Sequence, residues 1–218
     1  TVNGVVKTKT SPSATPNLTF KRSFYIENLL EELDFPGEWY IDSENDILYF
    51  YPPEEITEDT EVKIAVFDDT VIVMDKSENV RVENIVLDGG RKDGIQMSDT
   101  VNCEVAGCEL KHFLGIAVFM NEAINSGVSS CDVKHTADMG IYLLNDGSEL
   151  QTLIHSNNYI DNCIVTDVCR QRKSGVAAIG LGNSVGNVVS HNKIYDTPFF
   201  AIIAMGNDNI VEYNDISN

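Results

Sequence analysis

The sequence predicts an all-β fold, a right-handed parallel β-helix of about five to six coils. A six-residue pattern recurs six times: an aliphatic residue, then Ile, Cys or Asn three places later, then another aliphatic residue two places further on. A second short apolar strand recurs inside the period, and no helical spacing of apolar residues separates the two strands. Such a repeat is typical of a β-solenoid, in which each coil packs on its neighbours.

The fourth position of the pattern sets the period. Its successive copies are 23, 23, 32, 29 and 22 residues apart, at Ile85, Cys108, Cys131, Cys163, Asn192 and Asn214. The second strand is expected to begin at five equivalent dipeptides, Gly94-Ile95, Gly115-Ile116, Gly140-Ile141, Gly175-Val176 and Ala201-Ile202. Insertions belong in loops, so the two long periods predict surface loops within residues 145–157 and 169–174.

Stacking of coils explains the cysteines. Equivalent residues of neighbouring coils lie about 4.8 Å apart, so Cys108, Cys131 and Cys163 are expected to form one interior column of small apolar side chains. Asn192 and Asn214 would continue this column as a ladder of hydrogen-bonded amides. Redox or metal chemistry is the alternative for the thiols, but the column already accounts for three of the five cysteines.

A different element precedes the repeats, and the predicted domains are residues 1–60 and 61–218. Residues 8–17 are rich in Ser, Thr and Pro and predict an irregular arm. Residues 27–33 have the pattern of a short helix, and residues 38–42 and 47–51 predict a β-hairpin.

Charge excludes two classes of partner. The chain has 34 acidic and 15 basic residues, a formal net charge of −19, which disfavours nucleic acid and anionic membranes. The longest apolar run, residues 115–120, is far shorter than the roughly 20 residues needed to insert across a bilayer. The first residue is Thr1 rather than Met and no signal peptide is present, so a processed or excised chain is expected.

Four segments of the chain look familiar: residues 24–42, which include Phe35-Pro36-Gly37-Glu38-Trp39-Tyr40-Ile41-Asp42, and residues 48–53, 186–196 and 206–216. They resemble segments of large bacterial right-handed β-helix proteins with carbohydrate-active domains of the glycoside hydrolase and pectate lyase-like kind. The resemblance implies a secreted or cell-surface protein that acts on a polysaccharide or glycan.

The chain departs from these relatives in three places. They often have Gly-Gly-Asp-Arg where this chain has Asp146-Gly147-Ser148-Glu149, and Pro-His where it has Pro198-Phe199. They also continue into an acidic strand beyond the position of Asn218. The resemblance therefore implies that this chain holds only part of an active site. The final coil also lacks its Gly-Ile strand, which leaves an open sheet edge suited to end-to-end contact.

The candidate catalytic residues occupy one column. The seventh residue after each first aliphatic anchor is Gly89, His112, His135, Asp167, Asp196 or Asn218. Glycoside hydrolysis needs two carboxyl groups, and Asp167 and Asp196 on consecutive coils could supply them, with His135 beside them. The alternative is that these are polar turn residues whose side chains bond loop amides.

The candidate substrate-binding residues lie on the two long insertions. They are Asn145, Asp146, Arg170 and Arg172, and Arg172 resembles an arginine that relatives place in the same loop. Loops of a rigid scaffold are the usual place for such contacts. A solvated basic cluster that also includes Lys173 is the alternative for the arginines.

Three functions stay open from the sequence. The first is a glycan-cleaving domain, most plausibly a glycoside hydrolase, and the second is a non-catalytic module that binds a glycan or a surface partner. The third is a calcium-dependent polysaccharide lyase, for which Asp138, Asp146 and Asp167 offer oxygen ligands, although the glycine-rich calcium repeat is absent. No other metal or cofactor is predicted.

Overall fold

The computed structural model describes residues 28–217, which fall into two compact units that divide between Val62 and Lys63. The first unit contains a short 3-10 helix, η1 (Leu30–Glu32), and the predicted hairpin of β1 (Trp39–Asp42) and β2 (Ile47–Phe50). The two strands are antiparallel, with Trp39 opposite Phe50. The predicted arm at residues 8–17 and the first residue of the predicted helix lie outside the described residues.

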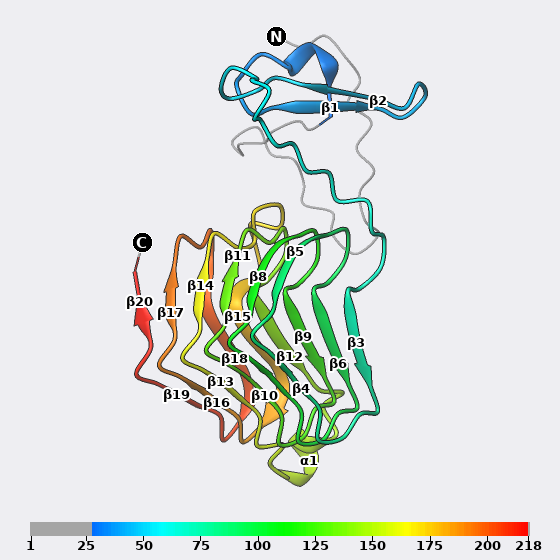
Figure 1. Ribbon diagram of the computed structural model, residues 1–218. Coiled ribbons are helices and arrows are strands. Elements are labelled where there is room, and N and C mark those ends of the chain that lie inside the picture. The colour runs from blue at the N-terminus through cyan, green and yellow to red at the C-terminus, as the bar shows by residue number, and fades with distance from the viewer. Residues whose placement is uncertain (1–27, 218) are drawn as a thin grey trace. The chain divides into compact units, whose positions relative to one another are not determined.

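The second unit is a right-handed parallel β-helix of six coils, as the repeat predicts. Three six-stranded parallel sheets run along it, and the strands of each sheet lie side by side in coil order (Figure 1). Sheet I consists of β3 (Ile72–Asp75), β6 (Ile95–Ser98), β9 (Val118–Asn121), β12 (Ile141–Leu144), β15 (Ala177–Val185) and β18 (Phe200–Asn207).

The other two sheets follow sheet I within each coil. Sheet II consists of β4 (Arg81–Glu83), β7 (Glu104–Ala106), β10 (Gly127–Ser129), β13 (Tyr159–Asp161), β16 (Val188–Ser190) and β19 (Ile210–Glu212). Sheet III consists of β5 (Val86–Gly90), β8 (Glu109–Phe113), β11 (Asp132–Lys134), β14 (Ile164–Thr166), β17 (Lys193–Tyr195) and β20 (Asp215–Ile216). We name the corners by the sheets they join: I–II, II–III and III–I.

The structure corrects two details of the repeat. Each six-residue pattern is two strands joined by a tight turn, so a coil has three strands rather than two. The residues of sheet I that align with Ile95 are Val118, Ile141, Ile179 and Ile202, so the expected starts at Ile116 and Val176 were wrong. Gly115 suggested a strand start, but it lies in the corner before the strand, under a side chain of the preceding coil.

The predicted thiol column is confirmed. Cys108, Cys131 and Cys163 are buried at the II–III corner, and the Cys108 N–H lies 3.4 Å from the Cys131 sulfur. The amide ladder continues it as expected, because Asn192 Nδ2 donates to Asn214 Oδ1 at 2.9 Å. These side chains satisfy the inward-facing N–H groups of the turns, which would otherwise be buried without a partner.

A second ladder at the I–II corner was not expected from the sequence. Here the N–H of each turn is bonded by the side chain of the next coil, through Ser126, Asn158, Asn187 and Asn209 in order. Inward-facing aliphatic residues of the three sheets, among them Ile95, Leu110 and Val128, fill the space between the ladders and are fully buried. The coil is thus fixed by apolar packing between two hydrogen-bonded columns.

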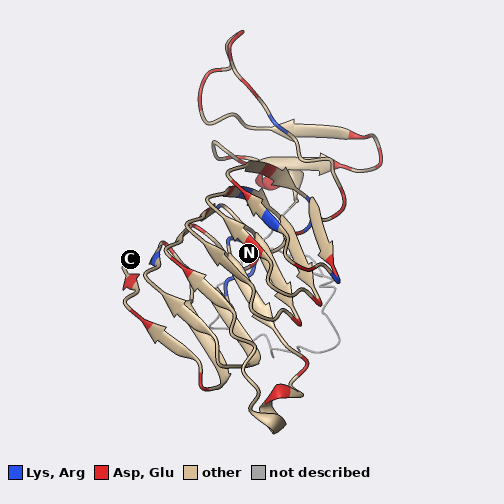
Figure 2. Ribbon diagram, turned by 60° about the horizontal axis from the view of Figure 1, so that its bottom comes forward, with Lys and Arg blue, Asp and Glu red and all other residues tan. Residues whose placement is uncertain are grey.

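The corners differ in regularity. The II–III corner has two residues in every coil, whereas the III–I corner spans residues 91–94, 114–117, 135–140, 167–176 and 196–199 in successive coils. The I–II corner carries the helix α1 (Glu149–Thr152), at the opposite end of sheet I from the III–I corner (Figure 1). Acidic residues recur at the turns of successive coils with few Lys or Arg among them (Figure 2).

Candidate functional site

The predicted column of catalytic candidates runs along the III–I corner. Strand register places Gly89, His112, His135, Asp167 and Asp196 on successive coils, at the ends of the sheet III strands or directly after them. All five have positive φ, from 46° at Asp167 to 94° at Gly89. Gly, Asn, Asp and His tolerate this left-handed conformation best, so the turn alone accounts for the residue types in the column. Asn218 lies outside the described residues.

Side chains of this column pair across the coils. His135 Nδ1 lies 2.7 Å from Asp167 Oδ2, and His112 Nδ1 lies 2.7 Å from Asp88 Oδ1. The two imidazole rings stack at 5.0 Å with an angle of 11° between their planes. Each ring is held in one orientation by a carboxylate, so its Nε2 atom is the one left for contact with a ligand.

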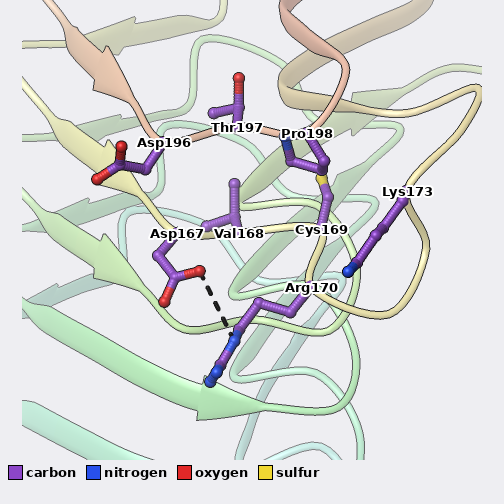
Figure 3. Close-up of a pocket in the computed structure, with 8 residues that line it drawn as sticks. All are labelled: Asp167, Val168, Cys169, Arg170, Lys173, Asp196, Thr197 and Pro198. Atoms are coloured by element: carbon purple, nitrogen blue, oxygen red, sulfur yellow. Dashed lines mark ion pairs between the residues drawn. The ribbon is translucent and has the colours of Figure 1, made fainter. Parts of the chain in front are cut away.

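A cavity of about 570 Å³ lies beside the end of this column. Its lining residues are Asp167, Val168, Cys169, Arg170, Lys173, Asp196, Thr197 and Pro198. Asp167 and Asp196 extend to the same side from neighbouring coils, while Lys173 lies across the cavity (Figure 3). Arg170 Nε is 3.6 Å from Asp167 Oδ1. The structure therefore brings together Asp167, Asp196 and Arg170, with His135 bonded to Asp167.

The long corner segment 167–176 is fixed to the preceding coil by backbone hydrogen bonds. Cys169 N–H donates to the carbonyl of Asp138, and the N–H groups of Gln171 and Arg172 both donate to the carbonyl of Ala137. Burial raises the pKa of the Cys169 thiol to about 12, so this cysteine is a packed apolar group at neutral pH. The anchored segment directs Arg172 away from the cavity, toward Asp138, at 3.3 Å.

Asp138 belongs to a second pair of carboxyl groups at the III–I corner. Its partner is Asp93, two coils earlier, which accepts a hydrogen bond of 2.7 Å from the Ile116 N–H. Burial raises the pKa of Asp93, and the charge of Asp138 adds to this effect, against the Ile116 bond, which lowers the pKa. Asp138 itself pairs with Arg172 and has a side chain that is 26% exposed. The two carboxyl groups therefore have unlike environments.

An aromatic pair lies on the outer face of sheet I, and one of its members, Tyr142, interacts with the same Arg172 that pairs with Asp138. The rings of Phe119 and Tyr142, on neighbouring coils, stack at 5.8 Å with an angle of 14°. The side chain of Tyr142 lies over two glycines of β15. A Cβ at Gly180 would lie 2.8 Å from the Tyr142 ring, and a Cβ at Gly182 would lie 2.7 Å from the Tyr142 hydroxyl. Burial raises the pKa of Tyr142. The result is a partly exposed aromatic platform, formed by Phe119 and Tyr142 over a floor without side chains.

The structure does not bring Asn145 and Asp146 to this corner. They follow β12 at the I–II corner, and Asn145 is only 1% exposed. Asp146 is exposed, and its carboxylate accepts the Ser148 N–H at 2.7 Å, which lowers its pKa. Their positions therefore do not support the prediction that Asn145 and Asp146 contact a ligand in the Asp167–Asp196 cavity.

Sequence reasoning missed Asp93 as a site residue and gave Asp138 only as a calcium ligand. A signal was present, since Asp93 stands one residue and Asp138 two residues before a Gly-Ile dipeptide at the start of a sheet I strand, Gly94-Ile95 and Gly140-Ile141. The aromatic platform also left a signal in the sequence. Phe119 and Tyr142 are each the second residue of a sheet I strand, and the two strands belong to consecutive coils.

The described residues contain neither a cluster of metal ligands nor a membrane-spanning helix. Between residues 28 and 217, no three or more His, Cys, Asp or Glu side chains are arranged to hold a metal ion. Of the candidate calcium ligands, Asp138 and Asp167 lie at the III–I corner and Asp146 lies at the I–II corner. In the same part of the chain, neither helix is long and apolar enough to cross a bilayer.

Comparisons with known proteins concern the fold. No curated protein and no solved structure gave a match to the chain. Residues 60–157, a little under half of the chain, match the family model described as a right handed beta helix region. Together with the three parallel sheets, this match identifies the chain as a right-handed parallel β-helix.

Proposed function

We propose that this β-helix is a carbohydrate-active domain of the glycoside hydrolase kind, with a polysaccharide or glycan as its ligand. The observation that carries the proposal is the cavity at the III–I corner, which contains two carboxylates of neighbouring coils and two cationic side chains. Its volume of about 570 Å³ falls within the range of small-molecule sites, roughly 300–1,000 Å³. Arg170 and Lys173 can donate to sugar hydroxyls, and Asp167 and Asp196 can accept from them.

In the hydrolytic form of this proposal, the residues predicted to act are Asp167, Asp196 and His135. Column neighbours are separated by one coil, about 4.8 Å, which is near the separation of 5–5.5 Å used by retaining enzymes. His135 is oriented by Asp167 at 2.7 Å, an arrangement that suits a general base.

A glycan array and a panel of chromogenic glycosides test the proposal. The unmodified chain, Arg170→Gln and Asp196→Asn are compared with Asp132→Asn, an exposed carboxylate on a sheet III strand away from the cavity. We expect both cavity variants to lose glycan retention by at least tenfold, and Asp132→Asn to retain it. Equal retention by all four proteins would remove the cavity from the proposal, and absence of both retention and hydrolysis would end it.

A non-catalytic glycan-binding module is the second candidate. The aromatic platform favours it, because stacking of sugar rings on exposed aromatic faces is a binding feature that requires no catalytic group. Retention of a glycan without hydrolysis of any glycoside would establish this form.

Location and further partners also stay proposals. We propose a secreted or cell-surface protein, a prediction that fractionation of the source cells would test. End-to-end contact is proposed at β18, β19 and β20, where Ile210, Val211 and Ile216 are each at least 45% exposed. A concentration-dependent shift in sedimentation that Val211→Lys abolishes would support this contact, and a constant monomer would contradict it.

A further inference from the structure

The III–I corner holds two carboxylate pairs, and they differ in what accounts for them. Asp167 and Asp196 occupy left-handed turn positions, for which Asp is a preferred residue whatever the function. Asp93 is not in such a position: it is half-buried beside another acid, which costs free energy for an ionised carboxyl group. Unlike environments of two nearby carboxyl groups are the means by which hydrolases separate the acid from the base.

We propose that Asp93 and Asp138 are the acid and base of the domain, acting on a sugar that stacks against Phe119 and Tyr142. This inference rests on the proposed carbohydrate-active function. It moves the reacting centre from the cavity to the neighbouring outer face of sheet I.

Gly115 determines the separation of the two carboxyl groups. Asp93 extends over this glycine, so close that a Cβ at Gly115 would lie 2.1 Å from Asp93 Oδ1. Gly115 and Asp138 hold equivalent places on neighbouring coils, because the Ala117 N–H donates to the carbonyl of Met139. The carboxyl group of Asp93 therefore sits one to two coil spacings from that of Asp138, about 5–10 Å. This range covers the separations that glycoside hydrolysis uses.

Arg172 and Tyr142 complete the site on the side of Asp138. Arg172 pairs with the Asp138 carboxylate at 3.3 Å and interacts electrostatically with the Tyr142 hydroxyl. The anchored segment 167–176 holds Arg172 in this place. Arg172 is thus a positioning residue for Asp138, and the aromatic platform begins one side chain away from the base.

The reaction is a single displacement. Asp93 donates its proton to the glycosidic oxygen as the bond from that oxygen to the anomeric carbon breaks. Asp138 takes one proton from a water molecule, whose oxygen forms the new bond to the anomeric carbon. The products are a reducing sugar and an alcohol, and transfer of the proton from Asp138 back to Asp93 through solvent restores the site.

The experiment uses paired substrates on the full chain. Asp93→Asn, Asp138→Asn, Asp167→Asn and Asp196→Asn are assayed on 2,4-dinitrophenyl and phenyl glycosides of galactose, glucose and xylose, and thermal melts confirm folding. Asparagine at position 93 can still accept the Ile116 N–H, so this variant is expected to fold. We expect Asp93→Asn to lose at least 100-fold on phenyl glycosides but less than tenfold on 2,4-dinitrophenyl glycosides, whose leaving group needs no proton. Asp138→Asn should lose at least 100-fold on both.

Several results would overturn the inference. If Asp93→Asn lost hydrolytic activity equally on phenyl and 2,4-dinitrophenyl glycosides, Asp93 would have a structural role rather than that of an acid. If its activity were unchanged on both, Asp93 would have no role in hydrolysis. If only Asp167→Asn and Asp196→Asn abolished hydrolysis, the reacting centre would lie in the cavity and the proposed function would still stand. If the unmodified chain cleaves none of these substrates, the acid–base inference fails; glycan retention would then still support the binding form of the proposed function.

Phe119→Ala and Tyr142→Ala separate binding from chemistry. Each is expected to raise KM at least tenfold on any glycoside that is cleaved, with a smaller effect on kcat, because stacking contributes to binding of the substrate. Leu153→Ala, an exposed apolar residue directly after α1, is the matched control and should change neither constant. Unchanged KM in both aromatic variants would contradict the assignment of the sugar to the aromatic platform.

Discussion

The II–III and III–I corners of the coil join the same sheet III to its two neighbours, yet they have opposite characters. The II–III corner has two residues in each coil and directs a side chain inward, where it accepts a hydrogen bond from the preceding coil. The III–I corner varies in length, and polar side chains such as Asp167 and Asp196 line a cavity on its outer side. An interior ladder of side chains fixes the length of one corner. The other corner is held by backbone hydrogen bonds to the preceding coil, which allow several lengths and leave it able to acquire a site.

The largest effect is expected from the inner side of the II–III corner. In Asn192→Ala, the buried Cys163 N–H and Ile160 carbonyl lose hydrogen bonds of 2.9 Å, and the bond to Asn214 is also lost. Two buried groups without partners should reduce the free energy of unfolding by about 3 kcal/mol, measured by urea denaturation. Asn162→Ala removes an exposed amide from the outer side of the same corner and should cost about 1 kcal/mol or less. Equal costs would contradict the distinction between inside and outside.

A moderate effect is expected where the III–I corner is tightly packed. In Gly115→Ala the new methyl group would meet Asp93 Oδ1 at 2.1 Å and backbone atoms of Lys92 and Asp93 at 2.9 Å. Displacement of this corner should cost about 1–2 kcal/mol in urea denaturation. The adjacent, exposed Leu114→Ala is the control and should change stability by less than about 0.5 kcal/mol. A neutral Gly115→Ala would show that Asp93 does not need its place over the glycine.

The sequence was sufficient for the regular part of this comparison. Cys108, Cys131 and Cys163 share one environment, so their residue type repeats with the coil and the column could be predicted. The same reasoning placed Asp167 and Asp196 on neighbouring coils. It did not find Asp93, because the relation to Asp138 spans two coils and depends on the side chain crossing Gly115. A repeat aligns equivalent residues and contains no information about a side chain that leaves its own coil.

A smaller effect concerns the titration of Asp93. Its pKa is raised in the folded protein, so the folded state holds the proton more tightly than the unfolded chain. Stability should therefore fall as the pH rises from the ordinary value of 3.8 through the raised pKa, and Asp93→Asn should remove this fall. Because solvent reaches the side chain, we expect less than about 1 kcal/mol in urea titrations at pH 3.5 and pH 7. A pH dependence that Asp93→Asn leaves unchanged would assign the effect to other groups.

The smallest effect compares two histidine–aspartate pairs, one at each corner. His112, in β8 beside the III–I corner, bonds Asp88 and is the main cause that lowers the pKa of that carboxyl group. His191 at the II–III corner bonds Asp161, whose pKa is also lowered: burial raises it, but hydrogen bonds from Ser190 and His191 outweigh burial.

The lowered pKa of Asp88 stabilises the fold above the ordinary value of 3.8, and this contribution is lost as the pH falls through the lowered pKa. His112→Gln should therefore cost less than about 0.5 kcal/mol at pH 7, since the pair is accessible to solvent, and nothing measurable at pH 2. His191→Gln should cost still less, because Ser190 continues to donate to Asp161 at 2.7 Å. A larger cost for His191→Gln would mean that the outer face of the regular corner depends on its side chains as strongly as the variable corner does.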